Sequence, residues 1–211
     1  MSTVLSRRTL LMASAGGLVG ATSSLQAAAR SDSDTVPPVP LFVRVVTVDG
    51  SAVVNAAVVD DAITQAVGIF GEHGLSFVEA RPRATIDPAF ADVITRDDRD
   101  RFAALVLPGM VNVFVVRKLE DVDEPGRVRM GVAWRCLRDL EKKYVLVASY
   151  ARAKVMAHEL GHFLGNPHSK VKNNLMSYEH EEGARVFLDA AQARVAKATA
   201  RQLFASKKLK L

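Results

Sequence analysis

Hydrophobic residues recur with two different periods along the chain, and each period predicts one kind of element. Short runs of β-branched and other apolar residues, bounded by Gly, Pro or Asp, are typical of strands. Longer stretches with apolar residues every three or four positions predict amphipathic helices. The runs predict strands over Leu41–Val48, Leu75–Ala80, Val111–Lys118, Gly131–Trp134 and Tyr144–Ser149. The longer stretches predict helices over Ala52–Glu72, Asp97–Leu105, Ala151–Gly165 and Leu188–Phe204.

Turns and irregular segments connect these elements. Asp49-Gly50 predicts a turn after the first strand, and residues 81–96, which contain two prolines, predict an irregular connection. The ending Lys207-Lys208-Leu209-Lys210 is most simply a solvated tail. The sequence shows no internal repeat, so we expect a single domain over residues 41–211.

The first thirty residues predict an export signal. Arg7 and Arg8 precede an uncharged stretch whose short apolar middle, Leu10 to Ala21, is followed by small residues. This order is typical of a signal peptide, and Ser-Arg-Arg-x-Leu-Leu resembles a twin-arginine signal. The middle is too short and too weakly apolar to span a membrane. We therefore expect residues 1–29 to be removed and the protein to be periplasmic or secreted, without a stable membrane anchor. An ordinary Sec signal with two arginines is the alternative.

Composition narrows the class of protein further. The 211 residues are 49% hydrophobic and 24% charged, which favours one globular domain over disorder. The single cysteine, Cys136, excludes a disulfide scaffold and is most simply a buried apolar side chain. The formal net charge of +5 comes without a concentrated basic stripe, so we expect no nucleic-acid partner. Residues 30–40 are polar and then Pro-rich, which predicts an extended arm.

The chemistry is concentrated in residues 158–168, His-Glu-Leu-Gly-His-Phe-Leu-Gly-Asn-Pro-His. On a helix, His158 and His162 are four positions apart and share one face, so both imidazoles can bind one ion. Glu159 points about 100° away from His158, beside such an ion rather than on it. A continued helix would carry His168 about 15 Å up the axis. The helix must therefore end near Gly165 if His168 is to be the third ligand.

Three imidazoles with one position left for water indicate a catalytic zinc site, with one Zn²⁺ per chain. A second segment follows at Asn174-Leu175-Met176-Ser177-Tyr178. With it, the chain resembles the metzincins, zinc metallopeptidases that combine the extended histidine motif with a Met-turn. The resemblance implies that Met176 forms an apolar floor beneath the metal, although ordinary core packing would also explain it. It further implies that Tyr178 approaches the zinc and stabilises an oxyanion; an exposed or packed tyrosine is the alternative.

The resemblance also implies the fold, which is α+β: a twisted mixed sheet with long helices, an active-site helix and a C-terminal helix. The predicted order of elements fits this plan. The connection from His168 to Met176 is very short, so we expect a minimal lower subdomain, and no branch of the clan can be assigned. In the clan, an edge strand pairs with the extended substrate. The residues that match it here are Gly131, Val132, Ala133 and Trp134, and packing is the simpler use of the Trp134 ring.

These residues together predict a zinc-dependent endopeptidase acting on a peptide or protein, with Glu159 as the general base. An exported zinc-binding protein without peptidase activity is one alternative, but metal retention alone would not require Glu159. A zinc amidohydrolase acting on a non-peptide amide is another, since the same chemistry would serve. Asp32 and Asp34 could reach the metal only if the short arm folded across the cleft. We therefore expect activity without a separate latency step.

Overall fold

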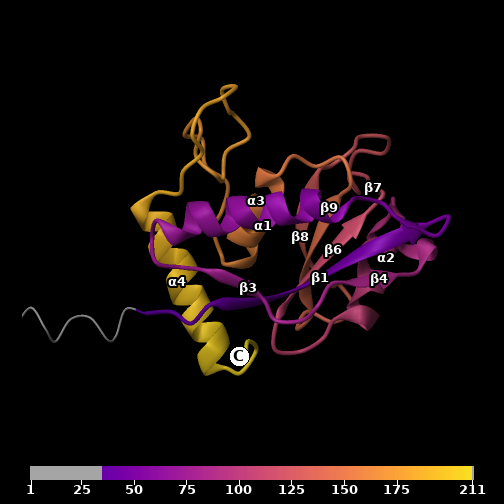
Figure 1. The fold of residues 1–211 in the computed structure, drawn as a ribbon, viewed down its shortest axis with the longest axis horizontal. Coiled ribbons are helices and arrows are strands. Elements are labelled where there is room, and N and C mark those ends of the chain that lie inside the picture. The colour runs from indigo at the N-terminus through magenta and orange to yellow at the C-terminus, as the bar shows by residue number, and fades with distance from the viewer. Residues whose placement is uncertain (1–34, 211) are drawn as a thin grey trace, which may run out of the picture. The chain divides into compact units, whose positions relative to one another are not determined.

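The computed structural model describes residues 35–210, so the predicted signal peptide and residues 30–34 of the predicted arm lie outside the described residues. The described part has α+β structure built on one twisted mixed sheet, which confirms the predicted fold class (Figure 1). Its strands are β1 Val39–Val48, β2 Ser51–Ala52, β3 Phe77–Glu79, β4 Ala84–Ile86, β5 Asp92–Val93, β6 Val111–Val116, β7 Lys118–Leu119, β8 Gly131–Arg135 and β9 Lys143–Ala148. Its α-helices are α1 Ala56–Gly71, α2 Arg96–Arg101, α3 Lys154–Phe163 and α4 Ala190–Ala205, and two 3-10 turns are η2 Pro88–Phe90 and η3 Phe102–Leu105.

The main sheet has seven strands in the order β2-β1-β6-β9-β8, with β3 and β4 also paired to β1. The pairs β1–β6 and β6–β9 are parallel, whereas β8 runs antiparallel to β9. β5 and β7 form a separate two-stranded sheet. Strand β8 therefore ends the order, and one of its sides has no neighbouring strand within the described residues.

Strand β6 is buried along its whole length because both faces of the sheet are covered. Val111, Val113 and Val115 face the larger core cluster, which also holds the inner residues of α1, α3 and α4. Phe114 and Val116 face a smaller cluster on the opposite side, which also contains Cys136, 2% exposed. The prediction of a buried cysteine is thus confirmed. Helices α1 and α3 share one face of the sheet (Figure 1), which leaves the outer side of α3 free to carry a site.

The first helix begins four residues later than the sequence predicts. Ser51 and Ala52 pair with the end of β1 as a short strand. Asn55 then caps α1, because its side-chain oxygen accepts a hydrogen bond of 3.0 Å from the N–H of Val58. Residues 81–96, predicted to be irregular, contain β4, η2 and β5. These strands are only two or three residues long and pair with distant segments, so no local period reveals them.

Both ends of the described chain are more firmly packed than the sequence predicts. The prediction of a solvated tail is wrong at Leu209, which is 2% exposed and belongs to the larger core cluster. The next residue, Lys210, donates its N–H to the carbonyl of Gly109 at 2.8 Å. At the other end, β1 starts at Val39 rather than Leu41, and Val36 is 6% exposed. Leu209 stands alone between lysines, and Val36 and Val39 stand singly beside prolines, so no hydrophobic period predicts this packing.

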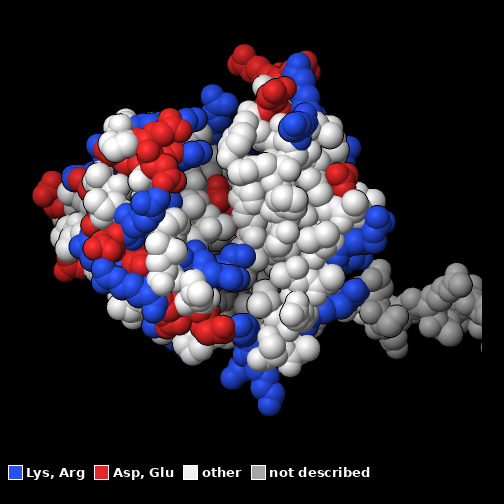
Figure 2. Space-filling model, turned by 180° about the vertical axis from the view of Figure 1, so that it is seen from behind, with Lys and Arg blue, Asp and Glu red and all other residues white. Residues whose placement is uncertain are grey.

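The surface of one face carries both signs of charge. Seen from behind, Lys and Arg lie among Asp and Glu over the side that carries the sheet, whereas a broad uncharged area covers the side of α4 (Figure 2). A groove separates the two areas in this view. No helix in residues 35–210 combines the length and apolar character needed to cross a bilayer.

Candidate metal centre

Three histidine side chains meet at the C-terminal half of α3. The Nε2 atom of His162 lies 3.1 Å from that of His158 and 3.0 Å from that of His168. Two nitrogens at tetrahedral positions around one zinc ion would be about 3.3 Å apart. Among the described residues, these three form the group that could hold a metal ion, with ligand atoms all within 4.8 Å of one another.

The sharp end of α3 is what returns His168 to the other two histidines. Gly165 adopts φ +91° and donates to the carbonyl of His162 at 3.0 Å. Asn166 donates to the carbonyl of Gly161 at 3.0 Å, which completes a Schellman motif. This φ is in the left-handed region, where glycine is favoured. The chain therefore leaves the helix and reverses within a few residues.

Lys143 supports the same helix end, a role that no pattern in the sequence indicates. Its Nζ atom donates to the carbonyls of His162 at 3.1 Å and Phe163 at 2.9 Å. Burial, and then the charge of Arg135, lower the pKa of this ammonium group to about 8. A cation at a helix C-terminus satisfies carbonyls that have no partner in the helix.

Hydrogen bonds at Nδ1 determine the tautomer of two of the imidazoles. His158 Nδ1 lies 2.7 Å from the carbonyl of Leu175, and His162 Nδ1 lies 2.8 Å from that of Asn166. A carbonyl only accepts, so each Nδ1 carries the proton and each Nε2 offers a lone pair. Burial lowers the pKa of His158, His162 and His168, to about 4 for His162, which favours the neutral form. Lone pairs converging at such distances repel each other unless a cation lies between them, so the residues fit a zinc ion.

Met176 lies beneath the histidines and is fully buried. A Cβ atom placed on Gly161 would collide with its sulfur, so only glycine allows α3 to lie this close to the turn. The turn is held by Asn174, whose side-chain oxygen accepts from the N–H of Met176 at 2.9 Å. Ser169 donates its N–H to the carbonyl of Met176 at 2.8 Å. The segments that carry His168 and Met176 are therefore directly joined.

Glu159 lies against strand β8 rather than among the imidazoles. It is 6% exposed, and a Cβ on Gly131 would be 2.7 Å from its Cγ and 3.0 Å from its Oε1. Burial raises the pKa of Glu159 to about 8, although a backbone hydrogen bond from Ala133 and the charges of Arg129 and Arg99 oppose the rise. Burial therefore favours the protonated form of this carboxyl group, and a cation bound by the histidines would favour the carboxylate.

Tyr178 stands on the solvent side of the histidines and is 67% exposed. Its hydroxyl oxygen lies 2.7 Å from His168 Nε2, and the two ring centroids are 4.5 Å apart. The phenol therefore reaches the point on which the histidine nitrogens converge.

Strand β8 presents alternate residues to its open side. At the two ends of the β8–β9 pairing, the N–H of Ala148 donates to the carbonyl of Met130, and the N–H of Cys136 donates to that of Lys142. Met130 and Cys136 therefore occupy hydrogen-bonded positions of the ladder. Antiparallel pairs alternate, so the N–H and C=O groups of Gly131, Ala133 and Arg135 point away from β9.

Val132 and Trp134 face the other side of the sheet, where they pack against the smaller core cluster. The indole N–H of Trp134 donates to Asp100 at 2.7 Å, and the guanidinium of Arg99 lies 4.8 Å from the ring centroid. Of the four residues predicted for the substrate strand, Gly131 and Ala133 thus face α3 and the open edge. The other two side chains serve packing.

No family model matches the sequence, and no curated protein matches it. Solved structures do resemble it. A promirolysin mutant from Tannerella forsythia matches with a TM-score of 0.61 at 11% identity, over 85% of this chain and 88% of that chain. Mirolysin in complex with a compound matches with a TM-score of 0.59 at 11% identity, over 83% and 99%. Metalloproteinase-II from Bacteroides fragilis matches with a TM-score of 0.52 at 11% identity, over 80% and 55%. The chain therefore shares the fold of these proteins, one of which is named a metalloproteinase.

Proposed function

We propose that the chain is an exported zinc-dependent endopeptidase that hydrolyses peptide bonds. The convergence of three imidazole Nε2 atoms, with a buried carboxyl group one residue along the helix, carries this proposal. The shared fold supports the broader class of metallopeptidase. Zinc is the ion that three histidines and an open position suit best in a hydrolase.

Each side chain of the site has a separate role in the proposed reaction. A zinc ion bound by the three histidines would supply an acidified water molecule and polarise a substrate carbonyl. The Glu159 carboxylate accepts the proton of the attacking water and passes it to the leaving amine. The Tyr178 hydroxyl donates to the oxygen that gains negative charge as the carbonyl is attacked. Met176 keeps the floor of the site apolar and dry.

The open side of β8 provides the place for an extended peptide. Backbone groups of Gly131, Ala133 and Arg135 can bond to a strand added at this edge. Gly131 has no side chain, so Glu159 of α3 lies directly against β8, next to the edge where the peptide would bind. The substrate is therefore a peptide or protein in extended conformation.

A cleavage assay tests the proposal. Zinc-loaded protein beginning at Arg30 should cleave casein, and phenanthroline should stop the cleavage by removing the metal. Glu159→Ala should abolish cleavage while zinc stays bound, because this side chain is not a ligand. Asp61→Ala, an exposed carboxylate on α1, is the matched control. Zinc-loaded protein that cleaves neither casein nor a mixed peptide library would exclude the endopeptidase, and a zinc-binding role or a non-peptide amide would then be the better reading.

Export is the second part of the proposal and rests on residues 1–29 alone. Replacing Arg7 and Arg8 by Lys should leave uncleaved precursor inside the cell if the route is the twin-arginine one. Unchanged export of this double variant would assign the signal to the Sec class.

A further inference from the structure

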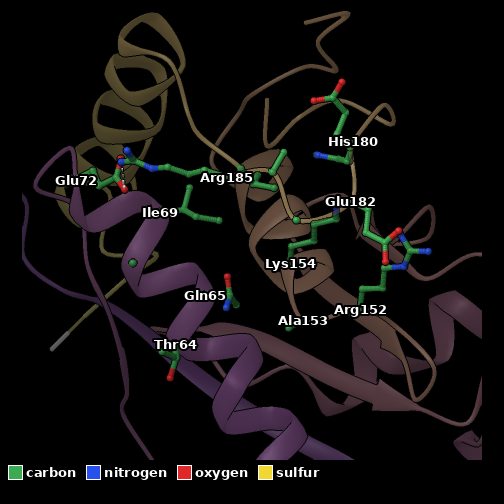
Figure 3. Close-up of a pocket in the computed structure, with 15 residues that line it drawn as sticks. Thr64, Gln65, Ile69, Glu72, Arg152, Ala153, Lys154, His180, Glu182 and Arg185 are labelled. Atoms are coloured by element: carbon green, nitrogen blue, oxygen red, sulfur yellow. Dashed lines mark ion pairs between the residues drawn. The ribbon is translucent and has the colours of Figure 1, made fainter. Parts of the chain in front are cut away.

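A pocket of about 950 Å³ lies beside the histidine cluster, between α1, the start of α3 and the loop of residues 180–186 (Figure 3). Lys154 lines it and stands four residues before His158, one helical turn away on the same side of α3. His180 lines it too, and its Nε2 donates to the carbonyl of Ser177 at 2.8 Å, next to the Met176 turn. The pocket therefore adjoins the metal centre without including any of the three imidazoles.

The pocket contains more unpaired positive than negative charge. Within residues 35–210, Arg152 and Lys154 line it without forming an ion pair. Burial, and then the charge of Arg152, lower the pKa of Lys154, and no acidic group opposes them. Arg185 is already paired with Glu72 at 2.6 Å, a contact visible in Figure 3.

The acidic side chains of the lining do not balance these two cations. Glu181 is paired at 2.5 Å with Lys172, which is not one of the residues that line the pocket. Glu182 is exposed and has no ion pair among the described residues. The lining therefore has two cations without an ion pair, Arg152 and Lys154, and one such carboxylate, Glu182. One further negative group would balance the charge.

The helix end in the pocket adds to the positive potential. Ala153 occupies the N-cap position of α3 and makes no side-chain cap, and the first turn has no acidic residue. A helix N-terminus is the positive end of the helix dipole, so cations beside it are unfavourable unless an anion is bound. His180 also leaves its buried Nδ1 atom without a hydrogen-bond partner within the described part of the chain.

We propose that this pocket binds a substrate carboxylate, the side chain of an Asp or Glu residue next to the scissile bond, and that Lys154 and Arg152 select it. The inference rests on the proposed peptidase function and names its substrate class. A peptide lying along β8 passes the histidines, and its next side chain can enter the pocket one helical turn away. The unpaired cations then gain the acidic partner that they lack.

Cleavage of a mixed peptide library, with the cut sites identified by mass spectrometry, measures this preference. We expect zinc-loaded protein to favour Asp or Glu over Asn or Gln about ten-fold at one position beside the cut, as a charge-assisted hydrogen bond would give. Lys154→Glu should remove the preference, and Arg152→Gln, which lies before the helix, should weaken it. Lys207→Glu makes the same charge change on an exposed lysine elsewhere and should leave the preference intact.

A steric variant tests the same pocket without altering charge. Gly68 lines the pocket, and nothing lies within 4 Å of the position where its Cβ would be. Gly68→Leu should fill part of the space and reduce cleavage beside acidic residues, while improving the helix propensity of α1. Gly71→Leu places the same side chain in open space on the same helix, outside the pocket lining, and should change nothing.

Peptide binding separates this inference from the proposed function. Fluorescence anisotropy of zinc-loaded Glu159→Ala protein would compare a short peptide of alternating Ala and Glu with its Gln counterpart. Tighter binding of the Glu peptide, lost on Lys154→Glu at unchanged zinc content, supports the pocket even if no peptide is cleaved. Equal binding of the two peptides, or no acidic preference in the library, would overturn it. Citrate binding that requires Lys154 without any discrimination between the peptides would also overturn it, because the pocket would then hold a free anion.

Discussion

The side-chain amides of Asn174 and Gln192 hydrogen-bond to each other in both directions. Asn174 Nδ2 donates to Gln192 Oε1 at 2.7 Å, and Gln192 Nε2 donates back to Asn174 Oδ1 at 3.0 Å. Asn174 is fully buried and also holds the N–H of Met176, while Gln192 completes the capping box of α4 with Asp189. This pair therefore couples the turn beneath the histidines to the last helix.

Gln192→Ala should destabilise the protein by about 1–3 kcal/mol, because it leaves the buried Asn174 amide without its partner. We also expect weaker zinc binding, since the Met176 turn loses its support. Urea unfolding and zinc titration would measure the two effects. Gln202→Ala, an exposed position on the same helix, is the control. Equal stability of the two variants would contradict the coupling.

Gly131→Ala should lower turnover by about ten-fold or more with zinc still bound. The added methyl group would lie 2.7 Å from Glu159 Cγ and Val155 Cγ1, so Glu159, which we propose as the general base, must shift. Steady-state kinetics with zinc analysis would show this. Gly71→Ala, where nothing lies within 4 Å, should behave like the wild-type protein. Full activity in Gly131→Ala would argue against the assigned position of Glu159.

His168→Ala should reduce zinc content, whereas Tyr178→Phe should not. The histidine supplies one of three converging nitrogens, while the tyrosine only approaches them with its hydroxyl group. We expect Tyr178→Phe to lower kcat with zinc at about one per chain. Elemental analysis alongside kinetics checks both. Zinc loss in Tyr178→Phe would instead make the phenol a ligand.

Asp100 should make the protein sensitive to acid. Burial alone would raise the pKa of its carboxyl group, but hydrogen bonds from Trp134 and Leu137 outweigh burial and lower the pKa. A lowered folded-state pKa means that this stabilisation is present above the unfolded-state value of about 4 and is lost as pH falls through the folded-state value. Asp100→Asn should reduce stability by about 1–3 kcal/mol at neutral pH and flatten its acid dependence. Thermal melts from neutral to acidic pH would show the difference, with Asp61→Asn as control. A pH profile parallel to the wild type would rule out this role.

Protein beginning at Arg30 and protein beginning at Thr35 should cleave peptides equally, because we expect no latency from Asp32 and Asp34. A large gain on trimming to Thr35 would indicate an inhibitory arm. Protein beginning at Leu41 should melt at lower temperature. This truncation removes the buried side chains of Val36 and Val39 and the hydrogen bond from the Val39 N–H to the carbonyl of Ser76.

The main elements were predictable because their signals are local. The strand Val111–Val116 is an unbroken apolar run, and the histidine spacing specifies both the helix and its end at Gly165. A metal ion requires a fixed set of ligand types and spacings, so the candidate centre could be identified without any tertiary information.

The remaining features depend on contacts between distant segments. Lys143 is an ordinary charged residue in the sequence, and only the fold brings it to the carbonyls of His162 and Phe163. The docking of Leu209 beside Gly109 joins segments a hundred residues apart. The hydrogen bonds between the side-chain amides of Asn174 and Gln192 likewise join separate segments, and no local pattern predicts them.

At the open edge of β8, a docking peptide and Glu159 would compete for one backbone N–H group. The N–H of Ala133 is a single donor, and the carboxylate of Glu159 already occupies it. A strand that bonds to this edge competes for that donor, so docking exchanges one partner of Ala133 for another. The exchange would leave the Glu159 carboxyl group without its hydrogen bond from Ala133. Under the proposed function, docking of a peptide would therefore free the Glu159 carboxyl group to act as the general base.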